Sequence, residues 1–328
     1  MSPEETRLRD DILELKQIRR AIILAHNYQR DEVQEIADFT GDSLELSRTA
    51  SEIDCDVIVF AGVAFMAESA SILCPDKTVL LPEIDAGCPM ADMINVAAPR
   101  QEMKQFPGFS SPPRYIYPAR FTLRDIKAQY PGAPVVAYVN TTAAVKAESD
   151  ICCTSANVAK VIDSLPEDTV ICVPDRNLSM WAQHNTKKKV IAWDGFCHVH
   201  ERVKPDDVAA ARKEHPKALV MAHPECRLDV LEMADHITST SGMLRFANTS
   251  TEKEFIVGTE IGLLYRLRKE NPDKVFYPLC KDMICPTMKK TTLNSVFRAL
   301  KDNTFIIKVP EEVRIPAKKA LDRMLAIR

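Results

Sequence analysis

Three of the ten cysteines occupy corresponding positions in a pattern that recurs three times along the chain. Each follows, by a similar distance, a polar residue that ends an apolar run: 62 residues separate Cys88 from His26, 59 separate Cys197 from Tyr138, and 62 separate Cys285 from His223. Three cysteines in one register indicate a shared ligand set, because thiolates are common metal ligands in proteins.

A set of three thiolates favours one kind of metal centre. Structural zinc usually takes four protein ligands, often in CxxC pairs, and this chain contains no CxxC. Electron-transfer clusters usually have four thiolates. Three thiolates would leave one iron of a [4Fe-4S] cluster open to bind a substrate oxygen and help a hydroxyl leave as water. The cysteines therefore predict a dehydration rather than an electron transfer.

Further polar residues share the same register. A spacing of 17 residues separates His26 from Ser43, Tyr138 from Ser155, and His223 from Thr240. Two residues after the first member of each pair lie Tyr28, Asn140 and Glu225. A spacing that holds at three places indicates an internal repeat.

The repeat predicts α/β units with parallel sheets. The run 21–25 is apolar without alternation, as in a parallel strand that is covered on both faces. The segment 31–39 favours a crossover helix that ends at Gly41, and Asp42 or Ser43 suits the N-cap of the next helix. Each unit contains three apolar runs separated by such helices. The predicted fold is three α/β/α units around a pseudo-threefold axis and a central iron-sulfur site.

The strand ends predict a binding site for a small anion. Ligands of open parallel sheets sit beyond the carboxyl ends of the strands, and the starts of helices favour negative charge. Around a threefold axis, the cysteines and all nine polar residues can face one cavity. The ligand would be multiply anionic and held by hydroxyl, amide and imidazole groups.

The unit boundaries follow from the cysteines. We expect a first unit of residues 1–87 with 286–328, a second of 88–196 and a third of 197–285. The proline-rich passage between Cys88 and Tyr138 connects the first two units, and the tail 291–328 is expected to form a helix and a short strand, 304–309, that return to the first unit.

Composition excludes several classes of partner. The net charge of −3 is spread over both signs, so neither nucleic acid nor an anionic membrane is favoured. The first 20 residues lack the apolar core of a signal peptide, and no run approaches the length of a membrane span. We expect a soluble cytoplasmic protein whose cysteines are thiols or metal ligands.

Simpler interpretations exist for each residue taken alone. A single histidine is more often structural, a serine before a helix is usually an N-cap, and a buried cysteine is usually a small hydrophobe. Three other classes of protein remain open: a zinc or iron structural protein that would not need His26, Tyr138 or Glu225, a hydro-lyase without a triose phosphate site, and a metal-free anion-binding module.

The motifs resemble those of the quinolinate synthase family over almost the whole chain. They occur in the order AHNYQRDEVQEIADFTGDSLELSR, FAGVAFMAESASIL, GCPM, YVNTTAAVKAESDICCTSAN, VPDRNL, WDGFCHVH, AHPE, STS and ICPTMKKTTL. The resemblance implies three homologous α/β/α units around one [4Fe-4S] cluster. It also implies condensation of iminoaspartate with dihydroxyacetone phosphate to quinolinate, phosphate and water in NAD biosynthesis. A functional link to an L-aspartate oxidase or dehydrogenase would supply the unstable iminoaspartate.

The resemblance also implies residue roles. Cluster ligands would be Cys88, Cys197 and Cys285, and the substrate-binding residues would be His26, Tyr28, Ser43, Tyr138, Asn140, Ser155, His223, Glu225 and Thr240. Of these, His26, Ser43, Tyr138, Asn140 and Ser155 would hold carboxylates, while Ser155 and Thr240 are alternatives for the phosphate. Tyr28 and Glu225 would transfer protons, with His223 orienting Glu225 or the substrate. His198 is a candidate neighbour of the cluster. Cys280 lies five positions before Cys285 instead of in the CxxCxxC of some members, so its redox role stays open.

Overall fold

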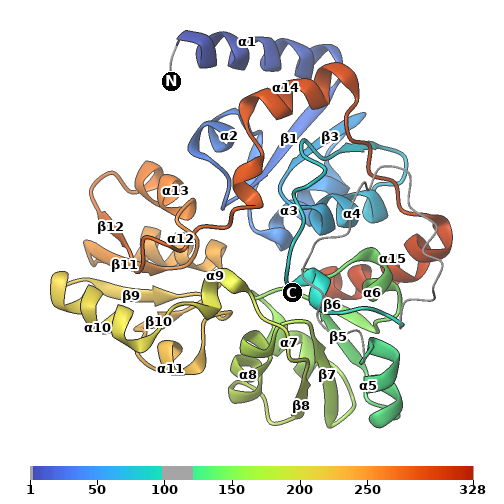
Figure 1. Cartoon of the computed structure of the whole chain (residues 1–328), viewed down its shortest axis with the longest axis vertical. Coiled ribbons are helices and arrows are strands. Elements are labelled where there is room, and N and C mark those ends of the chain that lie inside the picture. Colours follow the sequence, from blue (N-terminus) through green and yellow to red (C-terminus); the bar gives the residue numbers. More distant parts are fainter. Residues whose placement is uncertain (1–2, 98–120, 328) are drawn as a thin grey trace.

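Three four-stranded parallel sheets form the molecule. The computed structural model describes residues 3–97 and 121–327, and its sheets have the strand orders β2-β1-β3-β4, β6-β5-β7-β8 and β10-β9-β11-β12. Figure 1 shows the three units around a common centre, the first in blue, the second in green and the third in yellow to orange. The predicted α/β fold with three similar units and parallel sheets is confirmed.

The elements of the three units follow the same order along the chain. The first unit contains α1 (Pro3–Ile18), β1 (Ala21–His26), α2 (Asp31–Ile36), β2 (Phe39–Gly41), α3 (Ser43–Glu52), β3 (Val57–Ala61), α4 (Ala64–Leu73), β4 (Thr78–Leu80) and the 3-10 turn η1 (Ala91–Met93). The second contains α5 (Leu123–Gln129), β5 (Val135–Tyr138), α6 (Ala143–Ala147), β6 (Ile151–Cys153), α7 (Val158–Asp163), β7 (Thr169–Val173), α8 (Arg176–His184) and β8 (Lys189–Ala192). The third contains α9 (His198–Glu201), α10 (Pro205–Glu214), β9 (Leu219–Ala222), α11 (Leu228–Leu231), β10 (His236–Ile237), α12 (Thr240–Thr249), β11 (Glu254–Gly258), α13 (Leu263–Glu270), β12 (Val275–Pro278) and the 3-10 turn η2 (Met288–Lys290).

Each sheet has one strand more than the sequence predicted. The additional strands β2, β6 and β10 contain only three, three and two residues, which is too short for a recognisable pattern. Gly41 therefore lies in a strand and does not end the preceding helix, which stops at Ile36. The alternative that Asp42 caps α3 is confirmed, because its carboxylate accepts the N–H groups of Leu44 and Glu45.

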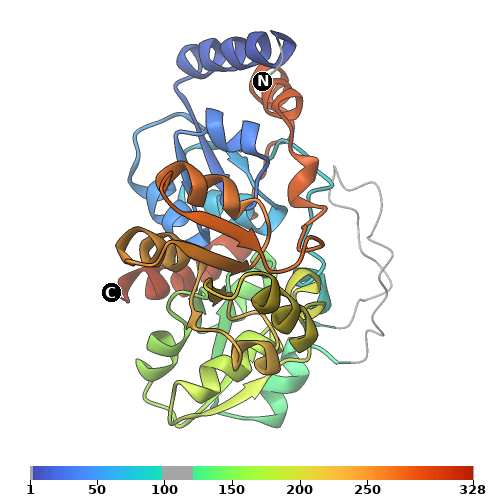
Figure 2. The same cartoon turned by 90° about the vertical axis from the view of Figure 1, so that its left-hand side faces the viewer.

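The C-terminal tail contacts two units. Helix α14 (Leu293–Asp302) packs against α1, and both views show the two helices side by side (Figures 1 and 2). Helix α15 (Glu311–Ala326) packs mainly against α6 and β6 of the second unit. The predicted strand at 304–309 is not formed as a strand, since Ile306 makes only an isolated antiparallel bridge with Leu80.

Edge strand β4, which contains Leu80, is short and is soon followed by Pro82, and this limits further pairing.

The unit boundaries and the burial of the cysteines were also predicted from the sequence. The proline-rich passage lies partly outside the described residues, at 98–120, and the unit boundaries stay a prediction. All ten cysteines are free thiols, and six of them are buried as expected for small hydrophobes: Cys55, Cys74, Cys152, Cys153, Cys172 and Cys226. Within residues 3–97 and 121–327, no helix is long and apolar enough to cross a membrane.

One side-chain hydrogen bond occurs in every unit and supports the central strand. An aspartate just before the short additional strand accepts a backbone N–H of the central strand: Asp38 from Ile23 at 2.8 Å, Asp150 from Val135 at 2.7 Å, and Asp235 from Val220 at 2.8 Å. The bond gives an acceptor to a backbone N–H that no neighbouring strand pairs with. Because it occurs in all three units, we regard it as part of their shared structural framework.

The framework role predicts a stability loss in Asp150→Ala. The N–H of Val135, a fully buried residue, would lose its acceptor, and an unsatisfied buried donor costs about 1–3 kcal/mol. Urea unfolding should show a decrease of that size in the free energy of unfolding. Asp76→Ala, at an exposed position in the loop before β4, is the matched control and should change stability little; an equal effect of both substitutions would contradict the role.

Candidate active site

One cavity collects every predicted substrate-binding residue and every predicted cluster cysteine. The central strands β1, β5 and β9 end at His26, at Tyr138 and just before His223, so their carboxyl ends deliver these side chains to the centre of the molecule. The predicted residues that line the cavity are His26, Tyr28, Ser43, Cys88, Tyr138, Asn140, Ser155, Cys197, His223, Glu225, Thr240 and Cys285. The structure therefore brings all twelve together, while their binding and catalytic roles stay predictions.

Two of the three hydroxyl residues begin a helix. Ser43 is the first residue of α3 and Thr240 is the first residue of α12, so both lie where free backbone N–H groups favour an anion. Ser155 lies between β6 and α7, three residues before the helix starts at Val158. The expected position of the hydroxyl residue at a helix start is therefore found for Ser43 and Thr240, whereas Ser155 lies three residues before its helix.

A backbone hydrogen bond places each cysteine at the end of a strand. The third residue after β3, β7 or β11 donates its N–H to the carbonyl two residues before the cysteine: Ala64 to Ala86 at 2.8 Å, Arg176 to Gly195 at 2.8 Å, and Ile261 to Met283 at 3.0 Å. A helical turn then begins soon after each cysteine, namely η1, α9 and η2. We call this repeated bond the strand-end clamp.

The turns after the cysteines direct N–H groups at the sulfur atoms. The N–H groups of Met90 and Ala91 lower the pKa of Cys88, and those of His200 and of Thr287 and Met288 do the same for Cys197 and Cys285. Such donors stabilise a thiolate that is bound to a metal. The chemistry of this donor set therefore fits a metal centre.

Burial has the largest effect on the pKa of the three thiols and makes them weaker acids. It raises the pKa of Cys88 to about 12, and it also raises the pKa of Cys197 and of Cys285. Without a metal these groups stay protonated at neutral pH, so they are poor nucleophiles. Metal binding would release their protons, as is usual for buried thiol ligands.

Two histidines are held as the same neutral tautomer. Nδ1 of His26 accepts the N–H of Tyr28 at 3.2 Å, and Nδ1 of His223 accepts the N–H of Glu225 at 3.3 Å. Burial lowers the pKa of both histidines to about 3. The proton of each neutral ring must therefore be on Nε2, and for His223 that atom lies 3.1 Å from Ser155 Oγ.

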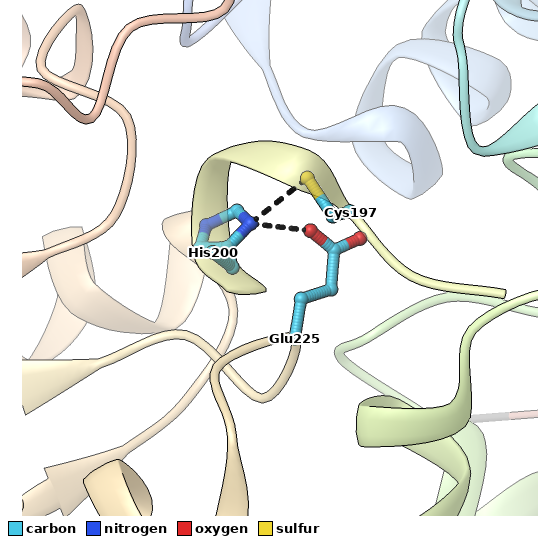
Figure 3. Close-up of side chains that lie close together, drawn as sticks. All are labelled: Cys197, His200 and Glu225. Carbon is cyan, nitrogen blue, oxygen red and sulfur yellow. Dashed lines mark hydrogen bonds and ion pairs between the residues drawn. The ribbon is translucent and has the colours of Figure 1, made fainter. Parts of the chain in front are cut away.

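A buried contact between a histidine and a carboxylate lies beside one cysteine. His200 Nδ1 is 2.7 Å from Glu225 Oε2 and 3.2 Å from Cys197 Sγ (Figure 3). Burial is the largest single influence and would raise the pKa of Glu225, but its interactions with His200, His223 and Tyr138 together lower that pKa below its ordinary value. Glu225 is therefore ionised, and its Oε1 has no hydrogen-bond partner among the described residues. An unpaired buried oxygen of this kind is available to a ligand.

A second chain of contacts leads from His200 to Tyr28. Thr259 Oγ1 lies 3.0 Å from His200 Nε2 and 2.6 Å from the hydroxyl of Tyr28. Burial raises the pKa of Tyr28 well above its usual value, so its phenol carries a proton. Tyr28, Thr259, His200 and Glu225 thus form a continuous polar network that joins the first unit to the third.

Two members of this network, His200 and Thr259, were not predicted. His198, next to Cys197, was the predicted neighbour of the cluster, whereas the histidine of this helix that lines the cavity is His200, which is fully buried; a role for His198 stays a prediction. His200 lies one helical turn after Cys197, a spacing that could have identified it. Thr259 directly follows β11, but no feature of the sequence shows its contact with Tyr28.

The fold and the cavity define an α/β protein with three repeated units and a central thiol-lined site. A family model described as "Quinolinate synthetase A protein" matches residues 10–326. Among curated relatives, the quinolinate synthase of Thermodesulfovibrio yellowstonii is 58% identical over 319 residues, which cover 97% of this chain and 97% of the relative. The quinolinate synthase of Geobacter sp. strain M21 is 53% identical over 320 residues, covering 98% and 97%. The chain therefore belongs to the quinolinate synthase family, and the resemblance read from the motifs is confirmed.

The neutral state of His26 predicts a pH-dependent stability. Its pKa is about 3 in the folded protein and about 6.5 in an unfolded chain, so below pH 6.5 the unfolded state binds one more proton and stability falls. By linkage, lowering the pH from 7 to 5 costs about 2 kcal/mol for this histidine. His26→Asn, whose side-chain oxygen can replace Nδ1 as acceptor, should reduce the pH dependence by that amount.

Urea unfolding of the metal-free protein at several pH values measures this difference. Above pH 7.5 neither state binds the extra proton, so the stability difference between wild type and His26→Asn should be constant there and serves as the control. The same pH dependence for both proteins between pH 7 and 5 would contradict a buried neutral His26.

Proposed function

We propose that this chain condenses iminoaspartate with dihydroxyacetone phosphate to form quinolinate, phosphate and water, a step of de novo NAD biosynthesis. The observation that carries the proposal is the cavity itself: three cysteines, each in the loop after the last strand of a different sheet, line it together with the polar strand ends. Membership of the quinolinate synthase family supports the same reaction.

We propose that Cys88, Cys197 and Cys285 hold one [4Fe-4S] cluster. The three sulfur atoms line one cavity, and backbone N–H groups point at each of them. When bound, the cluster would supply one iron without a protein ligand, which can act as a Lewis acid on a substrate oxygen. The proposed use of the cluster is therefore not redox transfer.

The substrate site would use the donors around this centre. Nε2–H of His26, the hydroxyls of Ser43, Tyr138 and Ser155, and the amide of Asn140 are the proposed partners of the carboxylates. Asn140 Oδ1 is buried and has no partner among the described residues, so this oxygen can accept from a donor of the substrate, whereas a carboxylate would be held by the amide N–H groups. Thr240 is placed to hold the phosphate, and Ser155 is the alternative.

Proton transfer would involve Glu225 and Tyr28. Glu225 is ionised and can accept a proton from a substrate carbon or nitrogen, while Tyr28 is protonated and can donate to a leaving hydroxyl. His223 would orient the substrate through its Nε2–H, because its Nδ1 is already used by the backbone. His200 would hold Glu225 in place through their 2.7 Å contact.

A mononuclear metal site is the second candidate, and one observation favours it. Ligand atoms of Cys197, His200 and Glu225 all lie within 4.8 Å of one another. Such a mixed set suits zinc with an open position. It would not use Cys88 or Cys285, so the two candidates differ in which cysteines matter.

Cysteine substitutions test the ligand set. Cys88→Ala, Cys197→Ala and Cys285→Ala should each abolish the cluster, because each removes one of three ligands. Cys172→Ala, at a buried cysteine of the second sheet, is the matched control and should keep it. Iron and sulfide analysis after anaerobic purification measures the result. About one metal ion per chain without sulfide, in wild type and Cys88→Ala alike, would point to the mononuclear set, and normal iron and sulfide in Cys88→Ala would refute Cys88 as a ligand.

Product formation tests the reaction. Anaerobic wild-type protein with iminoaspartate and dihydroxyacetone phosphate should release quinolinate, and omission of either substrate should stop it. Glu225→Gln should lower kcat by about 100-fold or more while iron content stays normal, since loss of a general base costs about 10²–10⁴-fold. If wild-type protein that contains the cluster makes no quinolinate, the proposed function is refuted. Full activity of Glu225→Gln would show that Glu225 is not the general base.

The chemistry of the substrate extends the proposal to its supply. Iminoaspartate is unstable in water, so we propose a functional link to an L-aspartate oxidase or dehydrogenase in the cytoplasm, where the ten free thiols would stay reduced. Equal quinolinate yields when a membrane separates the two enzymes would argue against direct transfer, and cell fractionation would test the location.

A further inference from the structure

Two buried carboxylates hold the backbone of two of the three cysteines. Asp175 lies two residues after β7 and Glu260 lies two residues after β11, so they occupy equivalent positions. Asp175 Oδ2 accepts the N–H of Cys197 at 3.1 Å, and Glu260 Oε1 accepts the N–H of Cys285 at 3.1 Å. Asp175 is 1% exposed and Glu260 is 0% exposed.

Each carboxylate uses its second oxygen to fix the turn that carries it. Asp175 Oδ1 accepts the N–H of Leu178 at 2.8 Å, and Glu260 Oε2 accepts the N–H of Gly262 at 2.7 Å. One rigid group thus joins the turn after the strand to the cysteine loop. The joint lies beside the strand-end clamp, which links the same two segments through the backbone.

The first unit lacks this carboxylate. The residue two positions after β3 is Val63, whose side chain accepts no hydrogen bond. By contrast, the strand-end clamp and the aspartate bonds to the central strands occur in all three units. The carboxylate bond is therefore not required by the repeated framework, and its presence at two cysteines needs another reason.

We propose that Asp175 and Glu260 are positioning residues that keep Cys197 and Cys285 in ligand geometry before the cluster binds. The inference rests on the proposed three-cysteine centre. Fixing the cysteine N–H removes backbone freedom from a loop that must otherwise be ordered at the moment of metal binding. The loop of Cys88 has the strand-end clamp but no carboxylate at the equivalent position.

Glu260 also joins its cysteine loop to the first unit. Lys289 Nζ lies 3.0 Å from Glu260 Oε1 and donates to the carbonyl of Tyr28 at 2.6 Å. The position of Cys285 is thereby tied to the strand end that carries His26 and Tyr28. Asp175 makes its bonds within the segment 175–197, so its effect should be confined to the loop of Cys197.

Isosteric amides discriminate this role from simple burial. Asp175→Asn and Glu260→Gln keep the size of the side chain but leave one oxygen where two N–H groups need an acceptor. After anaerobic loading, each variant should lose iron to a chelator about 10- to 100-fold faster than wild type, because removing a group that orients a metal ligand usually lowers metal affinity by that factor and weaker binding is expressed mainly as faster release. The measurement is the rate of absorbance loss, with circular dichroism of the metal-free protein as the test of folding.

Asp150→Asn is the matched control. It changes a carboxylate that also accepts a backbone N–H in the second unit, but this bond belongs to the strand framework and the amide retains one oxygen for it. Its rate of iron loss should equal that of wild type. Wild-type rates in both Asp175→Asn and Glu260→Gln would overturn the inference, whether or not their stability changes. Failure of wild-type protein to bind iron and sulfide would instead refute the proposed centre itself.

Discussion

One backbone hydrogen bond recurs three times and fixes the loops that carry Cys88, Cys197 and Cys285. The strand-end clamp links the third residue after β3, β7 or β11 to the loop that carries a cysteine. Because parallel strands present their carboxyl ends on one side, three such loops converge only if the units face one another. The clamp therefore converts a repeated fold into one central set of thiols, and the polar ends of β1, β5 and β9 come to the same place.

Burial of this site sets its electrostatics. Burial disfavours charged side chains, so most histidines and thiols of the cavity are neutral. It accordingly lowers the pKa of His26 and raises that of Cys88. Glu225 is the exception, because its contacts with His200, His223 and Tyr138 together keep it ionised. The cavity thus holds an ionised Glu225 next to Cys197, while Asp42, the other acidic residue of its lining, is already used as the cap of α3. Such an arrangement suits a ligand that brings its own negative charges and needs one proton acceptor.

The sequence predicted the parts that the repeat determines. Spacing along the chain alone indicates that Cys88, Cys197 and Cys285 are equivalent, and the same register places His26 and His223 at strand ends. The short strands β2, β6 and β10 were missed, because two or three residues carry no periodicity.

Other features were missed because they depend on side-chain direction. His200 and Thr259 meet Tyr28 only through contacts between units, and spacing along the chain does not report such contacts. Asp175 and Glu260 were visible in the sequence, but nothing there shows that their oxygens reach a cysteine N–H. The path of the tail was likewise incomplete, since α15 packs on the second unit through tertiary contacts that amphipathicity alone does not specify.

The central claim is that three cysteines, one after the last strand of each sheet, bind the same metal centre. Anomalous diffraction at the iron edge, from crystals of anaerobically loaded protein, tests it most directly. The account predicts iron in one compact group bounded by Cys88, Cys197 and Cys285, with one iron lacking a protein ligand. A single metal ion held by Cys197, His200 and Glu225, with Cys88 and Cys285 unliganded, would contradict it.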